Sequence, residues 1–339
     1  MKITRVVVAT PSMIDQSRLE KSLGAAGNYE ISAQTHDLSA TYARVEELMP
    51  DIVIVSEFFF QQDEYSCMVS LFRAVEARVF TLVPSPSDAT KALSDPFALH
   101  ARMSPQVLDK VLQSVPAEPS VQPQHSAPAP IFAKPTLGGF DPKKVILIGA
   151  STGGIDALTT ILQHFPVDCP PTAIVQHTGQ NFSETLARLL NKRCAAEVVL
   201  AKSGLEMKTG RVCLAGGIDG HLRLESGPPL MCRVERGALT SGHIPSIDEL
   251  FFSGLPNAHN TVAALLTGMG RDGAVGLLRL LQAGAVTIGQ DMETSVVYGM
   301  PRVAFEMGAV QQQLPLPAIG PTLLASCSIG AATRRHIEA

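Results

Sequence analysis

Short runs of apolar residues alternate along the chain with longer segments in which apolar positions recur every three or four residues. The short runs are typical of buried strands and the longer segments of amphipathic helices. In the first 115 residues the expected strands are 5–10, 29–32, 51–56 and 79–84, and the expected helices are 17–23, 39–49, 63–76 and 105–115. This alternation predicts a parallel sheet flanked by helices, a flavodoxin-like α/β domain.

The same alternation returns after residue 144. The expected strands are 145–150, 172–177, 261–268 and 285–291, and the expected helices are 155–164, 183–193, 246–258 and 273–283. Between residues 197 and 226 the pattern is more β-like, with turn residues between short apolar runs. A second parallel α/β domain is therefore expected.

A segment of different composition separates the two patterns. Residues 116–135 contain six prolines in twenty positions, mixed with Ser, Ala and Gln. Such a composition buries too little apolar surface to fold and tends to stay extended. The expected organisation is a first domain over 1–115, a Pro-rich linker over 116–141, a second domain over 142–327 and a tail over 328–339.

Composition and charge exclude several classes of protein. Of the 339 residues, 45% are hydrophobic and 17% charged, which is typical of a globular protein. The net charge of −4, without any run of Lys or Arg, argues against nucleic acid or an anionic membrane as the main partner. No apolar stretch is long enough to insert into a membrane, and the chain opens on a strand rather than a signal peptide, so we expect a cytoplasmic protein. The six cysteines are scattered without a CxxC pair, which predicts neither a disulfide framework nor a zinc site.

The glycine-rich turn that follows strand 145–150 carries the first candidate chemistry. Its sequence, Gly149-Ala-Ser151-Thr-Gly153-Gly154, can cradle a nucleotide phosphate or present a serine as a nucleophile. A dinucleotide fingerprint needs glycine where Ser151 stands, and an acidic residue at the end of the next strand, where this sequence has His177. Both departures favour catalysis by Ser151 in a G-x-S-x-G turn, although a plain turn has the same composition.

A serine and histidine pair needs a carboxylate to orient the imidazole and stabilise its charged form. Ser151 and His177 each follow a strand, and neighbouring parallel strands end at the same edge of a sheet. Asp272, Asp291 and Asp248 are all candidates for the third residue, and spacing does not choose among them. The order Ser–His–Asp disfavours the α/β-hydrolase superfamily, in which the histidine comes last.

Five sequence blocks in the second domain form a specific signature when taken in order. They are IGASTGG, IVQH, GHIPSIDELFFS, LLTGMGRDGA and QDMETSVVYGMPRVA. Through these blocks, residues 145–325 resemble the catalytic domain of the chemotaxis protein-glutamate methylesterases, the CheB family. The resemblance implies a triad of Ser151, His177 and Asp272. It also implies a parallel α/β domain with an antiparallel hairpin, and a reaction without metal or organic cofactor.

The resemblance further implies an activity and its partners. The family hydrolyses glutamate γ-methyl esters on the cytoplasmic helices of methyl-accepting chemoreceptors, and some members deamidate glutamine. The backbone N–H groups of Thr152 and Met269 are the expected oxyanion donors. A chemotaxis kinase or other signalling proteins are further expected partners. Thr178-Gly179 stands where the family usually has Met-Pro, so the particular receptor is not specified.

The first domain departs from the receiver that the resemblance implies. A receiver needs an acidic pair after its first strand and a phosphoacceptor aspartate after its third. Here Thr10 and Pro11 follow the first strand, Ser56 stands at the phosphoacceptor position, and Val83 replaces the expected hydroxyl residue. Without carboxylates to hold Mg²⁺, aspartyl phosphorylation lacks its chemistry. We therefore predict a degenerate receiver without a phosphoacceptor, for which the adjacent Glu57 is a poor substitute.

Three functions compete at this point. A serine esterase uses all three candidate triad residues, whereas a non-catalytic docking scaffold in a chemosensory complex needs none of them. A nucleotide-binding protein would use the turn at 149–154, but Ser151 and His177 disfavour it. The pattern therefore favours the esterase.

Overall fold

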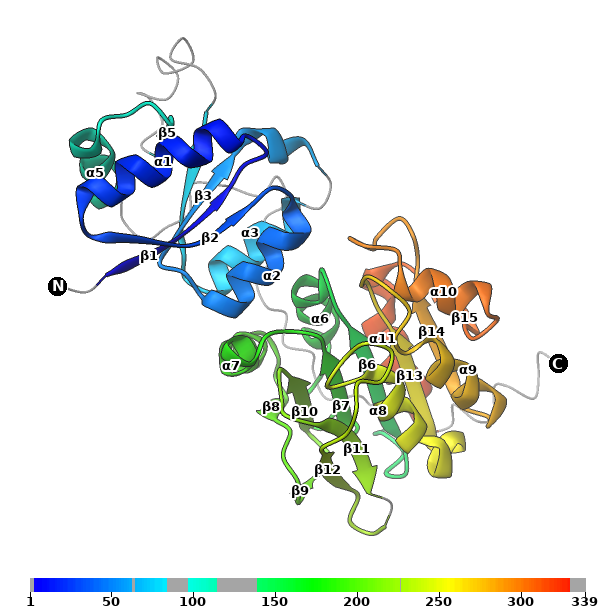
Figure 1. Ribbon diagram of the computed structural model, residues 1–339. Coiled ribbons are helices and arrows are strands. Elements are labelled where there is room, and N and C mark those ends of the chain that lie inside the picture. Colours follow the sequence, from blue (N-terminus) through cyan, green and yellow to red (C-terminus); the bar gives the residue numbers. More distant parts are fainter. Residues whose placement is uncertain (1–2, 63–64, 84–96, 115–138, 226, 330–339) are drawn as a thin grey trace. The chain divides into compact units, whose positions relative to one another are not determined.

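The computed structural model describes residues 3–62, 65–83, 97–114, 139–225 and 227–329 (Figure 1). Its contacts divide the chain into two compact units, residues 1–127 and 128–339. Most of the expected linker, 116–141, and most of the expected tail, 328–339, lie outside the described residues. Within the described part of the chain, no helix is both long and apolar enough to cross a membrane.

The first unit is built on a five-stranded parallel sheet. Its elements are β1 (Thr4–Ala9), α1 (Met13–Ala26), β2 (Tyr29–Thr35), α2 (Leu38–Leu48), β3 (Ile52–Ser56), the 3₁₀ helix η1 (Glu57–Gln61), α3 (Tyr65–Ala74), β4 (Arg78–Leu82), β5 (Ala98–Leu99) and α5 (Pro105–Ser114). The strand order is β2-β1-β3-β4-β5, and each pair is parallel. This is the flavodoxin-like order, so the predicted architecture is confirmed.

Helices cover both faces of the first sheet (Figure 1). Helix α1 packs against α5, and α2 packs against α3. The central strands β1 and β3 are buried almost throughout, with Val6, Val8, Ile52 and Ile54 fully inaccessible to solvent. Continuous apolar strands are expected when both faces of a parallel sheet are covered, and here they leave only the strand ends available for polar chemistry.

The second unit contains a larger parallel sheet and a small antiparallel one. Its strands are β6 (Val145–Ala150), β7 (Thr172–Gln176), β8 (Glu197–Leu200), β9 (Leu205–Glu206), β10 (Arg211–Gly216), β11 (His221–Glu225), β12 (Met231–Glu235), β13 (Thr261–Leu265), β14 (Val286–Gln290) and β15 (Gln312–Leu314). The parallel sheet has the order β15-β14-β13-β6-β7-β10-β8, and the antiparallel sheet the order β11-β12-β9. The hairpin β11–β12 confirms the hairpin that the resemblance implied.

Two helical layers sandwich the second parallel sheet (Figure 1). The helical elements are α6 (Gly154–Leu162), η2 (Gln180–Phe182), α7 (Ser183–Arg193), α8 (Ile247–Ser253), η3 (Leu255–Asn260), α9 (Ala274–Gln282), α10 (Met300–Glu306) and α11 (Leu316–Ser326). Helix α6 packs against α7 and α11, while α9 packs against α8 and α10. The strand order places β13, β6 and β7 side by side at the centre of this sheet, so their carboxyl ends are neighbours.

The helix expected over 246–258 is wrong as a single element. It divides into α8 and the 3₁₀ helix η3, with Gly254 between them and Pro256 at the start of η3. Proline cannot donate a backbone hydrogen bond and restricts the residue before it, so an α-helix does not continue through this point. Helices α10 and α11 were not expected, and both begin with proline in their first turn.

Candidate active site

The ends of β6, β7 and β13 place the first two predicted site residues beside each other. Ala150 pairs with Gln176 in the parallel ladder, so Ser151 and His177 are the next residues along two neighbouring strands. The N–H of His177 donates to the carbonyl of Ala150 (3.0 Å), and the N–H of Ser151 donates to the carbonyl of Thr267 (3.0 Å). Ser151 is thereby held between the end of β7 and the segment that follows β13.

Two glycines allow this close approach around Ser151. Gly153 has φ +80°, and a Cβ there would lie 2.7 Å from Cβ of Val296. A Cβ on Gly268 would lie 2.5 Å from Cβ of Ser151. Real Cβ atoms do not approach other carbons so closely, and positive φ is costly for other residues. The glycines therefore let the turn before α6 and the loop after β13 pack directly on the serine, whose exposed fraction is 8%.

His177 and Asp272 form the polar core of the site. Nε2 of His177 lies 2.8 Å from Oδ2 of Asp272, with side-chain exposures of 8% and 0%. The other ring nitrogen, Nδ1, is buried and makes no hydrogen bond within the described part of the chain. A hydrogen bond from Ser151 to this nitrogen is therefore not formed, and such bonds are often long before substrate binds.

The start of α8 holds the carboxylate of Asp272 from the other side. Oδ1 accepts from the hydroxyl of Ser246 (2.8 Å) and the N–H of Asp248 (3.0 Å), and Oδ2 accepts from the N–H of Ile247 (2.8 Å). Burial by itself raises the pKa of Asp272, but the bonds from His177 and from these amides outweigh it and lower that pKa below its ordinary value. Asp272 is therefore ionised and accepts a proton-bearing Nε2, which leaves Nδ1 of His177 as the basic nitrogen.

The two competing aspartates bind other groups. Asp248 accepts from the N–H of Gly276 (2.7 Å) and from the hydroxyl of Ser241 (2.8 Å). Asp291 accepts from the N–H (3.0 Å) and the hydroxyl (2.6 Å) of Thr294. Of the three candidates, Asp272 is the one that the structure brings to the histidine ring.

Sequence reasoning did not assign three residues that border the site. Gln176 donates from Nε2 to the carbonyls of Ser151 and His177 (2.9 Å each) and so joins the two strand ends. Ser246 holds Asp272, and His243 stacks on His177 with ring centroids 3.8 Å apart. Ser246 and His243 both lie in the block GHIPSIDELFFS. The block therefore indicated that this segment matters, but not which residues of the site its side chains contact.

The two expected oxyanion donors lie in loops that are pinned near Ser151. The carbonyl of Thr152 accepts from the hydroxyl of Thr267 (2.9 Å), and the carbonyl of Gly268, next to Met269, accepts from the N–H of Met300 (2.8 Å). The N–H groups of Thr152 and Met269 donate to none of the described residues. Among the described residues, no three His, Cys, Asp or Glu side chains are grouped to hold a metal ion.

The corresponding edge of the first sheet has a different character. A pocket of about 770 Å³ opens there between the segments that follow β1 and β3. The hydroxyl of Thr10 accepts from the N–H of Ser12 (3.2 Å), and the hydroxyl of Ser56 accepts from the N–H of Phe58 (3.3 Å). Phe58 is 62% exposed at this pocket. Both hydroxyls therefore serve local turns, and Ser56 occupies the position where a phosphoacceptor was expected.

A serine, a histidine and an ionised carboxylate at the carboxyl edge of a covered parallel sheet are the parts of a serine hydrolase. The comparisons with known proteins narrow this class. A family model described as CheB methylesterase matches residues 146–323. The chain belongs to the CheB methylesterase family.

Individual relatives agree with this assignment. The protein-glutamate methylesterase/protein-glutamine glutaminase of Agrobacterium fabrum is 36% identical over 95% of this chain and 96% of its own length. The protein of the same name from Rhizobium etli is 47% identical, over 62% of each chain. Among solved structures, the catalytic domain of the Thermotoga maritima CheB methylesterase is 33% identical with a TM-score of 0.52, covering 53% of this chain and 97% of its own.

Proposed function

We propose that this chain is a serine hydrolase that removes methyl esters from glutamate side chains of methyl-accepting chemoreceptors and also deamidates receptor glutamines. The observation that carries the proposal is the buried His177–Asp272 hydrogen bond beside Ser151. The names of its relatives support both reactions. No comparable support exists for a docking scaffold.

The roles in this reaction follow from the hydrogen bonding of the ring. Nδ1 of His177 takes the proton of the Ser151 hydroxyl while the oxygen attacks the ester carbonyl. Asp272 keeps the proton of Nε2 in place and stabilises the imidazolium. His177 then gives the proton from Nδ1 to the departing methoxide, which leaves as methanol. Water, activated by the same nitrogen, hydrolyses the glutamyl ester of Ser151. In deamidation, ammonia leaves instead of methanol.

The negative charge that develops on the ester oxygen needs donors that are already in place. We assign this role to the N–H groups of Thr152 and Met269, which donate to no other described residue. Their loops are fixed by the bonds from Thr267 and Met300. Removing one such donor from a serine hydrolase usually costs about 10²–10³ in rate.

The first unit is assigned as a degenerate receiver that does not take part in phosphotransfer. Ser56 at the phosphoacceptor position offers a hydroxyl already bound in a local turn, and Thr10 and Pro11 offer no carboxylate after β1. We place the reaction in the cytoplasm, where the methylated receptor helices lie, with a chemotaxis kinase or other signalling proteins as further partners. We assign the chain a first domain over 1–115, the linker 116–141, the catalytic domain 142–327 and the tail 328–339.

Two measurements test the proposal. The native chain should release methanol from a methylated receptor fragment, and a fluorophosphonate probe should label it at Ser151 alone. A chain that releases no methanol and is not labelled would be the docking scaffold instead. Labelling without methanol release would keep the serine hydrolase and reject the receptor as its substrate.

A further inference from the structure

His243 lies flat against the ring of His177. The ring centroids are 3.8 Å apart and the planes differ by 11°, which is a parallel stack. His243 comes from the segment between β12 and α8, far in sequence from the three triad residues. The stack covers one face of the His177 imidazole, and Asp272 holds the same ring at Nε2.

A tight turn presents His243. The N–H of His243 donates to the carbonyl of Thr240 (3.0 Å), and the two residues between them, Ser241 and Gly242, have φ +51° and +86°. Positive φ at both central positions is the signature of a type I′ turn. The hydroxyl of Ser241 donates to Asp248 on α8 (2.8 Å), so the turn is tied to the helix that also holds Asp272.

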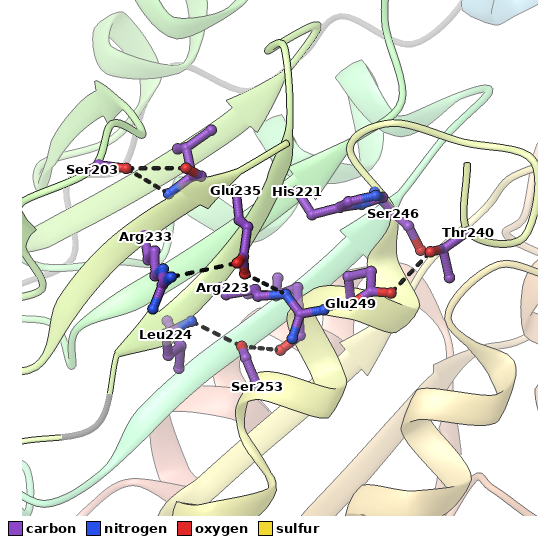
Figure 2. Close-up of polar contacts among 12 residues, drawn as sticks. Ser203, His221, Arg223, Leu224, Arg233, Glu235, Thr240, Ser246, Glu249 and Ser253 are labelled. Atoms are coloured by element: carbon purple, nitrogen blue, oxygen red, sulfur yellow. Dashed lines mark hydrogen bonds and ion pairs between the residues drawn. The ribbon is translucent and has the colours of Figure 1, made fainter. Parts of the chain in front are cut away.

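A second set of contacts connects the same turn, through α8, to the antiparallel hairpin (Figure 2). The hydroxyl of Thr240 donates to Oε1 of Glu249 (2.8 Å), and Glu249 pairs with Arg223 on β11. His221, also on β11, accepts from the N–H of Ser246 (3.1 Å) through Nδ1. The turn is therefore fixed to α8, which is itself bonded to β11, and its position does not depend on His243 alone.

We propose that His243 is a positioning residue for the esterase reaction: its ring fixes the plane of the His177 imidazole and stabilises the imidazolium formed when Ser151 loses its proton. This inference rests on the proposed function. A neutral aromatic ring attracts a cation stacked on it, and that attraction exists only after proton transfer, so it favours the transition state. The ring also keeps water from the stacked face of His177.

The charges around His243 suit this role. Burial lowers the pKa of His243, the charge of His177 lowers it further, and Asp272 opposes them in part. His243 is therefore neutral at neutral pH. The carboxylates of Asp248 and Glu249 are directed to the hydroxyls of the turn rather than to the ring. His243 faces His177 as an uncharged ring.

The test compares variants of the full-length chain. His243→Ala should lower both the rate of fluorophosphonate labelling at Ser151 and kcat for ester hydrolysis about tenfold, with little change in KM. The acid limb of its pH–rate profile should move to lower pH, because the imidazolium of His177 then loses the ring that stabilises it. His243→Phe keeps a flat, uncharged ring and should stay within about threefold of the native rate, with the acid limb unmoved. His164→Ala, at a partly buried histidine after α6, is the matched control and should change neither measurement.

The outcomes separate this inference from the proposed function. If the native chain is not labelled at Ser151, the proposed function is wrong. If it is labelled, and His243→Ala has the native rate and the native acid limb, the positioning role is wrong. If His243→Ala does not fold, His243→Asn is measured in its place with the same expected loss. A Phe variant as slow as the Ala variant would also overturn the proposal, since ring stacking could not then be the cause.

Discussion

The two parallel sheets of this chain differ most where they are otherwise most alike, at their carboxyl edges. In the second sheet, the side chains after β7 and β13 are joined into one buried system beside Ser151, in which Asp272 accepts from His177 and from the start of α8. In the first sheet, Thr10 follows β1 and Ser56 ends β3, and the bonds that their hydroxyls accept from described residues come from their own turns.

The difference shows that the fold supplies a location and the hydrogen bonding supplies the chemistry. Strand ends in open α/β sheets converge at one edge whatever residues follow them. Reactivity needs a group with an available lone pair and a second group that fixes its protonation. Nδ1 of His177 has both properties, since it is buried and makes no hydrogen bond to a described residue while Asp272 holds the opposite nitrogen.

Removing one hydroxyl from each edge should have the most different effects on the two units. Ser151→Ala should lower kcat for methanol release by about 10⁶, the usual cost of deleting the nucleophile of a serine hydrolase. Ser56→Ala is the matched control, because its hydroxyl accepts from Phe58 in a local turn, and its rate should stay native. His177→Ala should be as severe as Ser151→Ala. A Ser151→Ala variant that kept native turnover would refute the nucleophile.

The next largest effect concerns the carboxylate. Asp272→Asn should lower kcat by about 10⁴, since an amide no longer holds the proton on Nε2 of His177 or stabilises the imidazolium. Asp291→Asn changes a carboxylate that binds Thr294 in a neighbouring loop, and its rate should fall much less. Equal losses in the two variants would show that Asp272 does not act through the histidine.

The residues that could be predicted from the sequence are those whose role depends on strand order. Ser151 and His177 follow apolar runs, so their convergence follows from parallel pairing alone. Asp272, Asp248 and Asp291 could not be separated in this way, because the choice depends on side-chain direction: Asp272 and Asp291 lie in loops, and Asp248 lies in the first turn of α8. Only the block resemblance favoured Asp272, and the ring contact agrees with it.

The features that could not be predicted from the sequence, helix α11 and the stack of His243, have a similar physical cause. Helix α11 contains Pro317 and Pro321, and proline weakens any helical pattern, so packing against α6 rather than propensity determines it. The stack of His243 on His177 depends on a type I′ turn at Ser241 and Gly242. The turn itself depends on a few residues, but the contact between His243 and the ring of His177 depends on the fold of the whole domain.

A smaller effect is expected when phosphorylation is attempted. The full-length chain with Mg²⁺ and acetyl phosphate should form no aspartyl phosphate, and its esterase rate should change less than about twofold. Ser56 stands where the phosphoacceptor aspartate is expected, and the adjacent Glu57 is a poor substitute. Mass spectrometry and methanol release measure the two quantities. Stable phosphorylation of an acidic side chain in the first unit, with a matching rise in rate, would refute the degenerate receiver.

The smallest expected effect separates the two aspartates at α8 by the sign of their pH dependence. The pKa of Asp272 is below the ordinary 3.8, so its stabilisation is present above about pH 4 and is lost as pH falls through the lower value. Burial raises the pKa of Asp248, partly offset by the bond from Gly276, so its contribution is present below pH 3.8 and is lost as pH rises through the raised value.

Asparagine at each position should therefore change the acid dependence of the midpoint of thermal unfolding in opposite directions. Asp272→Asn should lower the free energy of unfolding at neutral pH by about 2 kcal/mol, the scale of a hydrogen bond to a charged group, and its midpoint should decline less on acidification. Asp248→Asn removes a carboxylate that is costly to ionise, so its midpoint should decline less as pH rises from about 4 towards neutrality. Parallel shifts in both variants would mean that the start of α8 holds the two carboxylates in the same way, and the assignment of Asp272 as the ionised partner of His177 would fail.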